Sequence, residues 1–164
     1  QIEERFNIAT VRLVNDFVAA GYGLLTLDID TECITLQAGE RKQGAPIGCI
    51  GSGTGLGETF LTCPVGGKDY DAYPTEGGHA EMAPRNDLEY EFIKYVKQAH
   101  GTTRVSVERL ASGSGLVNAY DFLCHAFPDR VDKEVDDAIR AAGDQKGKII
   151  SINSLVQGSI CEQV

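Results

Sequence analysis

Apolar and polar residues alternate in two rhythms along the first half of the chain, and each rhythm predicts its own kind of element. The β-branched run "IATVRLV" at residues 8–14 has the length and composition of a strand. The segment at 16–27 that follows has helical spacing, weakened by Gly21 and Gly23. Residues 45–73 alternate as paired strands do, and their "PVGGKD" stretch supplies a hairpin turn. A strand that leads into a helix is therefore predicted, followed by an antiparallel ribbon.

The clearest helix is predicted at residues 84–101. Asn86 and Glu89 have the spacing of a capping box, and Gly101 is suited to end the helix. Four apolar residues recur at helical spacing and are expected to form its buried face. They are Leu88, Phe92, Val96 and Ala99.

The rest of the second half is also predicted to be mainly helical. Ser106 has the position of a helix cap, residues 113–127 show helical spacing, and residues 131–142 read as a charged, solvated helix. The stretch "RAAGDQKGK" at 140–148 has the composition of a linker but is too short to separate domains. Strands and helices together indicate an α/β fold.

Composition narrows the class of protein. A length of 164 residues with 42% hydrophobic and 24% charged residues is typical of one globular domain. The net charge of -9 disfavours nucleic acid and anionic lipid as partners, because like charges repel. No apolar run reaches the roughly 18 residues of a membrane-spanning helix. A soluble protein without nucleic-acid or membrane partners is therefore expected.

The five cysteines and the two ends of the chain add two expectations. The cysteines are an odd number, lie far apart and never form a C-x-x-C pair, which disfavours both a disulfide framework and a zinc site. A reducing compartment fits this pattern. The chain opens on Gln1 and closes on "SLVQGSICEQV" without a helix-ending signal, so we expect a fragment of a longer protein.

Four segments are suited to chemistry, and the first is the glycine-rich "IGSGTGLGE" at residues 50–58. Such a turn lets backbone N–H groups approach a phosphate, and Thr54 would add a hydroxyl donor. Its glycine spacing fits neither the dinucleotide fingerprint nor the Walker loop. A tight hairpin between two strands explains the same glycines, so both interpretations stay open.

The second and third segments offer ligands for a small polar molecule. In "TEGGHAEMAP", Glu76 and His79 flank two glycines, although a surface turn explains them equally well. In "RVSVERLASGSG", Glu108 follows Ser106, where a carboxylate in a first helical turn also interacts favourably with the helix dipole. His100 and His125 lack partners at metal-ligand spacing, so no metal site made of protein side chains is expected.

The fourth segment is the Asn15–Asp16 pair, at the junction between the predicted strand and the predicted helix. Asp16 is expected to cap the helix by accepting a backbone N–H. A carboxylate held at such a junction can also face a ligand. The pattern alone does not decide between these two interpretations.

Taken in order, four blocks of the sequence resemble one family. "LVNDFVAAGYG", "IGSGTGLGETFL", "EGGHAEMAP" and "VSVERLASGSGLVNAY" resemble the corresponding blocks of bacterial-type glucokinases, which also occur in some protists and belong to the sugar-kinase and actin superfamily. The resemblance covers residues 8–127. The family's N-terminal D-x-G-G-T-N phosphate loop and its C-terminal adenosine-binding segment have no counterpart here. The C-x-C-G-x-x-G-C zinc signature of a neighbouring sugar-kinase group is also missing.

This resemblance implies a fold and a reaction. The fold is part of a two-lobed, actin-like (ribonuclease H-like) sugar kinase, with residues 1–25 as the end of the small lobe and the hinge, and residues 26–164 as a segment of the large lobe. The reaction is transfer of the γ-phosphoryl group of ATP, with its Mg²⁺, to the 6-hydroxyl of glucose. In that reaction Asp16 would orient the attacking hydroxyl and accept its proton.

The resemblance also implies which residues bind the substrates. The residues expected to bind sugar hydroxyls are Asn15, Asp16, Glu76, His79 and Glu108. The residues expected to contact the ATP phosphates are Gly53, Thr54 and Gly55. The expected partners are therefore glucose and ATP, and a homodimer is one assembly that the resemblance allows. The expected location is the cytoplasm, with a glycosome-like organelle as the alternative in some protists. Because half of the ATP site is missing, the chain alone is alternatively a sugar-binding module without complete catalytic machinery.

Overall fold

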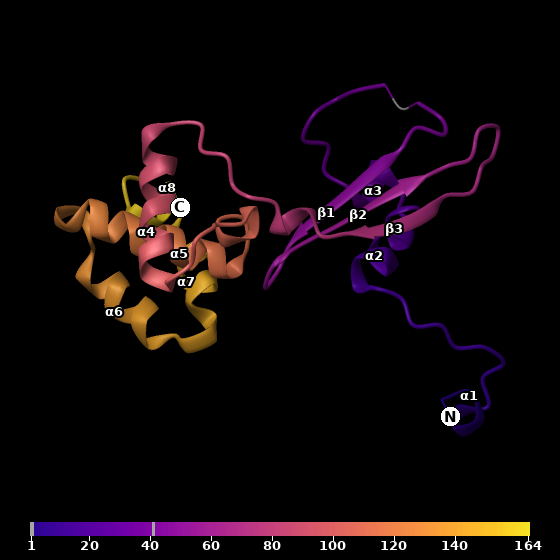
Figure 1. Cartoon of the computed structure of the whole chain (residues 1–164), viewed down its shortest axis with the longest axis horizontal. Coiled ribbons are helices and arrows are strands. Elements are labelled where there is room, and N and C mark those ends of the chain that lie inside the picture. The colour runs from indigo at the N-terminus through magenta and orange to yellow at the C-terminus, as the bar shows by residue number, and fades with distance from the viewer. Residues whose placement is uncertain (1, 41) are drawn as a thin grey trace. The chain divides into compact units, whose positions relative to one another are not determined.

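The computed structural model in Figure 1 describes residues 2–40 and 42–164. It divides into two compact units. Unit 1 comprises Gln1–Ile50 and Glu58–Thr75, and unit 2 comprises Gly51–Gly57 and Glu76–Val164. The lobe boundary predicted between residues 25 and 26 refers to the longer family fold and stays a prediction.

The N-terminal part of the chain forms short helices and a three-stranded sheet. The helices are α1 (Ile2–Phe6), α2 (Asp16–Leu24) and α3 (Ile29–Glu32). The strands are β1 (Ile47–Ser52), β2 (Leu56–Thr62) and β3 (Asp71–Thr75), in the order β1-β2-β3. Strands β2 and β3 run antiparallel, with Glu58 opposite Thr75 and Thr62 opposite Asp71. The antiparallel ribbon predicted over residues 45–73 is therefore confirmed, and so is the helix predicted after residue 15.

Helix α2 packs on the sheet through a glycine. A Cβ atom on Gly21 would lie 2.8 Å from Thr59 Cγ2 and 3.3 Å from Leu61 Cδ1, and both of these side chains are buried. Next to this glycine, the hydroxyl oxygen of Tyr22 accepts the N–H of Ala72 at 3.1 Å. The glycine that weakens the helix pattern is therefore what lets the helix approach the strands.

The strand predicted at residues 8–14 is wrong. This segment connects α1 to α2 without belonging to a strand, and the side chains of Leu13 and Val14 are 91% and 60% exposed. A β-branched run becomes a strand only where a neighbouring strand pairs with its backbone groups. None of the strands that the structure describes, β1, β2 and β3, pairs with this segment.

Unit 2 is mainly helical, as predicted. Its α-helices are α4 (Asp87–His100), α5 (Gly113–Ala126), α6 (Lys133–Ala141), α7 (Lys146–Asn153) and α8 (Ile160–Gln163). Its 3₁₀ turns are η1 (Gly77–His79), η2 (Val107–Arg109), η3 (Pro128–Arg130) and η4 (Gly143–Gln145). Helix α5 contacts α4, α7 and α8, and it contributes Tyr120, Phe122 and Leu123 to the buried core. In the described part of the chain, no helix has both the length and the apolar character needed to cross a membrane.

Helix α4 begins and ends at the predicted signals but buries a different face. Asn86 Oδ1 accepts the N–H of Glu89 at 2.9 Å, and Gly101 ends the helix with a φ of 59°. The buried residues are Phe92, Ile93 and Val96. Leu88 is 47% exposed and Ala99 is exposed, so two of the four predicted core positions are wrong. Helix α5 contacts α4, and burial follows this contact rather than the full apolar stripe of the sequence.

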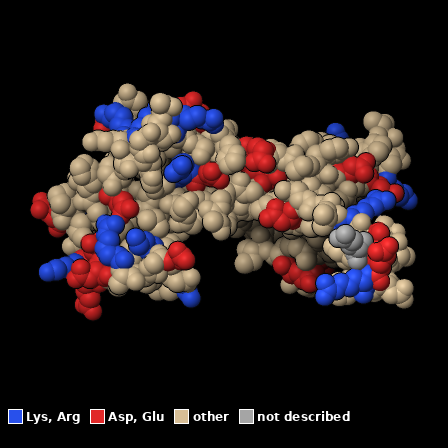
Figure 2. All heavy atoms as spheres, turned by 60° about the horizontal axis from the view of Figure 1, so that its bottom comes forward, with Lys and Arg blue, Asp and Glu red and all other residues tan. Residues whose placement is uncertain are grey.

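Charged side chains of both signs are mixed over the face drawn in Figure 2. Between α5 and α6, Arg140 forms ion pairs with Asp121 and Asp136. On the drawn face, the basic side chains of the described residues are interspersed with acidic ones and form no continuous basic surface for a nucleic acid backbone.

Candidate functional site

Three of the predicted sugar ligands lie together in unit 2. The imidazole of His79 stands between two carboxylates, with Nε2 3.1 Å from Glu108 Oε1 and Nδ1 3.4 Å from Glu76 Oε2. The side chain of Glu76 is 84% exposed, that of His79 60% and that of Glu108 26%. The cluster is therefore open to solvent on the Glu76 side, with Glu108 as its most buried member.

The turn that carries His79 requires a close approach of two backbones. A Cβ atom on Gly78 would lie 2.3 Å from the carbonyl oxygen of Leu56, so no residue larger than glycine fits there without a backbone shift. Two residues after Gly78, the carbonyl oxygen of Ala80 accepts the N–H of Val107 at 2.9 Å. This bond ties η1 to η2, and η2 contains Glu108. Two segments far apart in the sequence are thereby fixed side by side.

Ser106 has the predicted cap position, but it precedes only the short turn η2 and its side chain makes no capping hydrogen bond. The α-helix begins later, at Gly113. There Ser112 is the cap: its Oγ accepts the N–H of Gly115 at 3.0 Å and donates to the carbonyl oxygen of Glu108 at 2.6 Å. The start of α5 therefore also holds the backbone of Glu108 in place.

The glycine-rich segment at residues 50–58 forms a hairpin turn between β1 and β2, which confirms that interpretation. The N–H of Gly53 donates to the carbonyl oxygen of Gly55 at 2.8 Å and closes the turn. The carbonyl oxygen of Gly53 accepts the N–H of Gly113, the first residue of α5, at 2.8 Å. Thr54 is exposed at the tip. The turn therefore lies at the N-terminus of a fourteen-residue helix.

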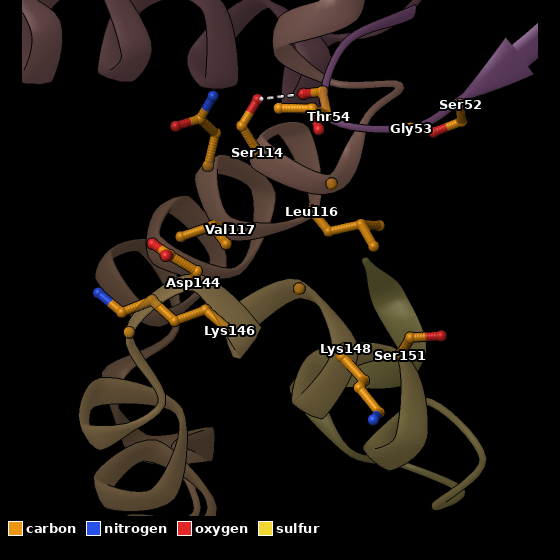
Figure 3. Close-up of a pocket in the computed structure, with 14 residues that line it drawn as sticks. Ser52, Gly53, Thr54, Ser114, Leu116, Val117, Asp144, Lys146, Lys148 and Ser151 are labelled. Carbon is orange, nitrogen blue, oxygen red and sulfur yellow. Dashed lines mark hydrogen bonds between the residues drawn. The ribbon is translucent and has the colours of Figure 1, made fainter.

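A pocket of about 860 Å³ lies beside this turn, within unit 2. Figure 3 shows Thr54 and Ser114 on one side of it and Lys146 and Lys148, from α7, on another. Two ammonium groups and the N-terminus of α5 make this pocket suited to an anionic ligand. Asp144 is the one acidic side chain among the lining residues that the structure describes.

The lysines of this pocket were not predicted as site residues. Lys146 and Lys148 belong to the stretch whose composition indicated a linker, and the structure places them in the first turn of α7. The available signal was two cationic side chains close together in the sequence, whereas Gly147 between them is needed because a Cβ there would lie 2.9 Å from the carbonyl oxygen of Gly113. The turn residues Gly53 and Thr54, which were predicted, line the same pocket.

In unit 1, Asn15 and not Asp16 caps helix α2. Asn15 Oδ1 accepts the N–H groups of Phe17 at 2.9 Å and Val18 at 3.1 Å. Asp16 is the first helical residue, and its Oδ1 accepts the N–H of Phe17 at 3.0 Å. The predicted cap is therefore wrong by one position, because the residue before the helix has the extended backbone that turns its side chain toward the first N–H groups. Among the residues that the structure describes, Asn15 Nδ2 and Asp16 Oδ2 have no hydrogen-bond partner.

Within residues 2–40 and 42–164, no group of three or more His, Cys, Asp or Glu side chains is arranged to hold a metal ion.

Comparison with known families and sequences gives one consistent result. The family model described as "Glucokinase" matches residues 1–161. A glucokinase of Nostoc sp. is 46% identical over 123 residues, which cover 75% of this chain and 35% of the relative. A glucokinase of Synechocystis sp. is 38% identical over 130 residues, covering 79% of this chain and 36% of the relative. The chain thus spans about a third of the length of these relatives.

Two crystal structures share the fold. A glucokinase from an Antarctic psychrotroph matches with a TM-score of 0.67 at 20% identity, over 97% of this chain and 53% of its own. A glucokinase from Balamuthia mandrillaris in complex with glucose matches with a TM-score of 0.53 at 20% identity, over 82% of this chain and 34% of its own. The predicted α/β fold, part of an actin-like sugar kinase, is confirmed.

Proposed function

The chain belongs to the glucokinase family, and on this basis we propose that the protein containing it transfers the γ-phosphoryl group of ATP to the 6-hydroxyl of glucose. One observation carries the proposal: His79 lies between the carboxylates of Glu76 and Glu108, at 3.4 and 3.1 Å. Glucose is the proposed sugar because the related protein of Balamuthia mandrillaris was crystallised with it.

The cluster around His79 suits a polyhydroxylated ligand. Each sugar hydroxyl donates one hydrogen bond and accepts others, a carboxylate only accepts, and a neutral imidazole does one of each. Glu76 and Glu108 therefore receive hydroxyl protons while His79 completes the ring of contacts. A sugar that lacks a matching hydroxyl would leave a desolvated group unpaired, and sites built this way reject such analogues by roughly 10⁴ or more.

Asp16 is the proposed proton acceptor. Its Oδ1 is held by the N–H of Phe17, which leaves Oδ2 for the 6-hydroxyl. In the transfer step the sugar oxygen forms a bond to the γ-phosphorus, the bond from that phosphorus to the bridging oxygen breaks, ADP leaves, and the hydroxyl proton moves to Oδ2. Asn15, whose Oδ1 caps the helix, has its Nδ2 amide available to a neighbouring hydroxyl.

The second substrate is ATP with its Mg²⁺. We propose that Gly53, Thr54 and Gly55 contact its phosphates, with the hydrogen bonds coming from the backbone N–H groups of Thr54 and Gly55 and from the threonine hydroxyl, since the N–H of Gly53 closes the turn. The N-terminus of α5 and the two lysines of α7 line the same pocket and offset the negative charge of the phosphates. Mg²⁺ supplies further charge neutralisation when bound, with phosphate oxygens and water as its main ligands.

A test of this function measures glucose-dependent ADP release in the natural protein that contains the chain. We expect turnover with glucose and ATP. Glu108→Gln should raise the KM for glucose roughly tenfold or more, because the neutral amide replaces one acceptor by a donor. Glu81→Gln is the control, since Glu81 is a nearby exposed residue that takes part in the fold through its backbone, which forms an isolated bridge with Ser106.

Glucose binding without any ADP release would instead favour the alternative of a sugar-binding module. Absence of both binding and turnover would refute the proposed substrate. The cytoplasmic location and the homodimer stay predictions.

A further inference from the structure

The carboxylate of Glu108 contacts both the sugar cluster and the glycine turn. Its Oε1 is 3.1 Å from His79 Nε2. Its Oε2 lies on the opposite side, 3.5 Å from the N–H nitrogen of Leu56 and 2.8 Å from the position that a Cβ atom on Gly55 would take. The carboxylate therefore occupies the space that any side chain at residue 55 would need.

A second connection runs through the start of α5. The hydroxyl of Ser112 donates to the carbonyl oxygen of Glu108 at 2.6 Å, and its Oγ is 3.0 Å from the Oγ of Ser114. The hydroxyl of Ser114 is in turn 3.5 Å from the carbonyl oxygen of Thr54, the contact drawn in Figure 3. Glu108 is thus linked to the glycine turn through its backbone as well as through its carboxylate.

We propose that Gly55 is a positioning residue of the sugar site, which acts by leaving room for the Glu108 carboxylate. This inference rests on the proposed function, in which Glu108 binds a sugar hydroxyl. Gly55 belongs to the turn proposed to hold ATP phosphates, so one residue of the phosphate turn fixes the orientation of a sugar ligand.

The neighbouring glycine separates this effect from a general need for small residues in the turn. A Cβ atom on Gly53 would meet no atom within 4 Å, whereas one on Gly55 would meet Glu108. Neither glycine is among those with positive φ, so the backbone accepts alanine at both positions. Alanine at residue 55 differs from alanine at residue 53 chiefly in displacing the carboxylate.

The shared contact also predicts coupling between the two substrates. A sugar bound to Glu108 limits the movement of the carboxylate, which contacts the turn. Phosphates bound to the turn limit the movement of the turn, and so also limit the positions open to the carboxylate. A change in sugar affinity caused by nucleotide must be matched by an equal change in nucleotide affinity caused by sugar.

The experiment measures glucose affinity by titration calorimetry, without nucleotide, in the natural protein that contains this chain. Gly55→Ala should weaken glucose binding roughly tenfold, the order expected when one hydrogen bond to a charged group is lost. Gly53→Ala is the matched control and should keep the glucose Kd within about twofold, whatever it does to nucleotide binding. Thermal unfolding of each variant reports whether the fold is retained.

A double-mutant cycle with Glu108→Asp tests the mechanism. The shorter side chain withdraws the carboxylate from residue 55, so the penalty of Gly55→Ala should shrink from about tenfold to about twofold when Glu108→Asp is also present. If Gly55→Ala alone does not fold, recovery of folding in the double variant supports the proposal, and continued unfolding overturns it.

Three results would overturn the inference. They are an unchanged glucose Kd in Gly55→Ala, an equal loss in Gly53→Ala, and a penalty that persists undiminished in the double variant. Failure of the unsubstituted protein to bind glucose would refute the sugar site itself, and this outcome is distinct from the other three.

Discussion

Asn15 combines a structural and a proposed substrate-binding role, and two substitutions separate them. Its Oδ1 accepts the N–H groups of Phe17 and Val18 at 2.9 and 3.1 Å, which caps α2. Its Nδ2 is available to a sugar hydroxyl. Asn15→Ala removes both groups, whereas Asn15→Asp keeps an acceptor oxygen for the cap, removes the amide donor and adds a negative charge beside Asp16.

The expected magnitudes differ between the two variants. Replacing a helix cap by alanine costs about 1 kcal/mol, which lowers the unfolding midpoint by roughly 1–2 °C in a protein as long as the relatives. Asn and Asp cap helices about equally well, so Asn15→Asp should melt within about 0.5 °C of the parent. Loss of one donor to a sugar hydroxyl costs about 0.5–1.5 kcal/mol, which raises the glucose Kd about twofold to tenfold in both variants.

Circular dichroism on heating and glucose calorimetry together test this reasoning. A midpoint in Asn15→Asp as low as in Asn15→Ala would refute the assignment of the cap to Oδ1. Parent-like glucose affinity in Asn15→Asp would refute the role of the amide donor. The two variants are informative as a pair, since both lose the amide donor and only Asn15→Asp keeps a capping oxygen.

Three further predictions concern other residues. Asp16→Asn should lower turnover roughly 10²-fold or more while the unfolding midpoint stays unchanged, and normal turnover in a steady-state assay would exclude Asp16 as the proton acceptor. Gly78→Ala should destabilise the protein by roughly 1–3 kcal/mol in a urea titration, because its Cβ would lie 2.3 Å from the Leu56 carbonyl oxygen. Burial raises the pKa of Tyr120 above its ordinary value of 10.0. The unfolded chain therefore loses the phenolic proton first, and the free energy of unfolding falls as pH rises through about 10. Tyr120→Phe should flatten this alkaline fall and, by losing the hydrogen bond to Asp136, cost about 1 kcal/mol at neutral pH.

Local signals predicted helix boundaries well and strand partners poorly. Asn86 and Gly101 delimit α4 as predicted, because a cap and a left-handed terminator depend on a few adjacent residues. Residues 8–14 have strand composition and yet form no strand, because pairing depends on another segment of chain. The cap of α2 was assigned one residue late, since neighbouring Asn and Asp are equally good caps and the pattern does not fix the first helical residue.

In the candidate site, too, contacts between residues close in the sequence could be predicted and contacts between distant segments could not. Glu76 and His79 are three residues apart, so their proximity follows from a single turn. The contact between His79 and Glu108 depends on the bond between Ala80 and Val107 and on the close approach at Gly78, neither of which has a signature in the spacing. The resemblance to glucokinases suggested Glu108 as a sugar ligand because membership of a family implies a tertiary fold. The periodicity of apolar residues implies only local secondary structure.

Three of the proposed sugar ligands and the proposed proton acceptor belong to different units of the structure, so sugar binding and phosphoryl transfer depend on different parts of the chain. Glu76, His79 and Glu108 are assembled within unit 2, whereas Asn15 and Asp16 belong to unit 1. In the proposed mechanism, turnover requires Asp16 of unit 1, whereas the contacts within the His79 cluster involve residues of unit 2 alone. Asp16→Asn keeps the shape of the side chain and can still hydrogen-bond to the 6-hydroxyl, but it cannot accept the proton, so it should reduce kcat far more than glucose affinity. An equal loss of both would mean that Asp16 acts mainly as a sugar ligand, and another group would then have to accept the proton.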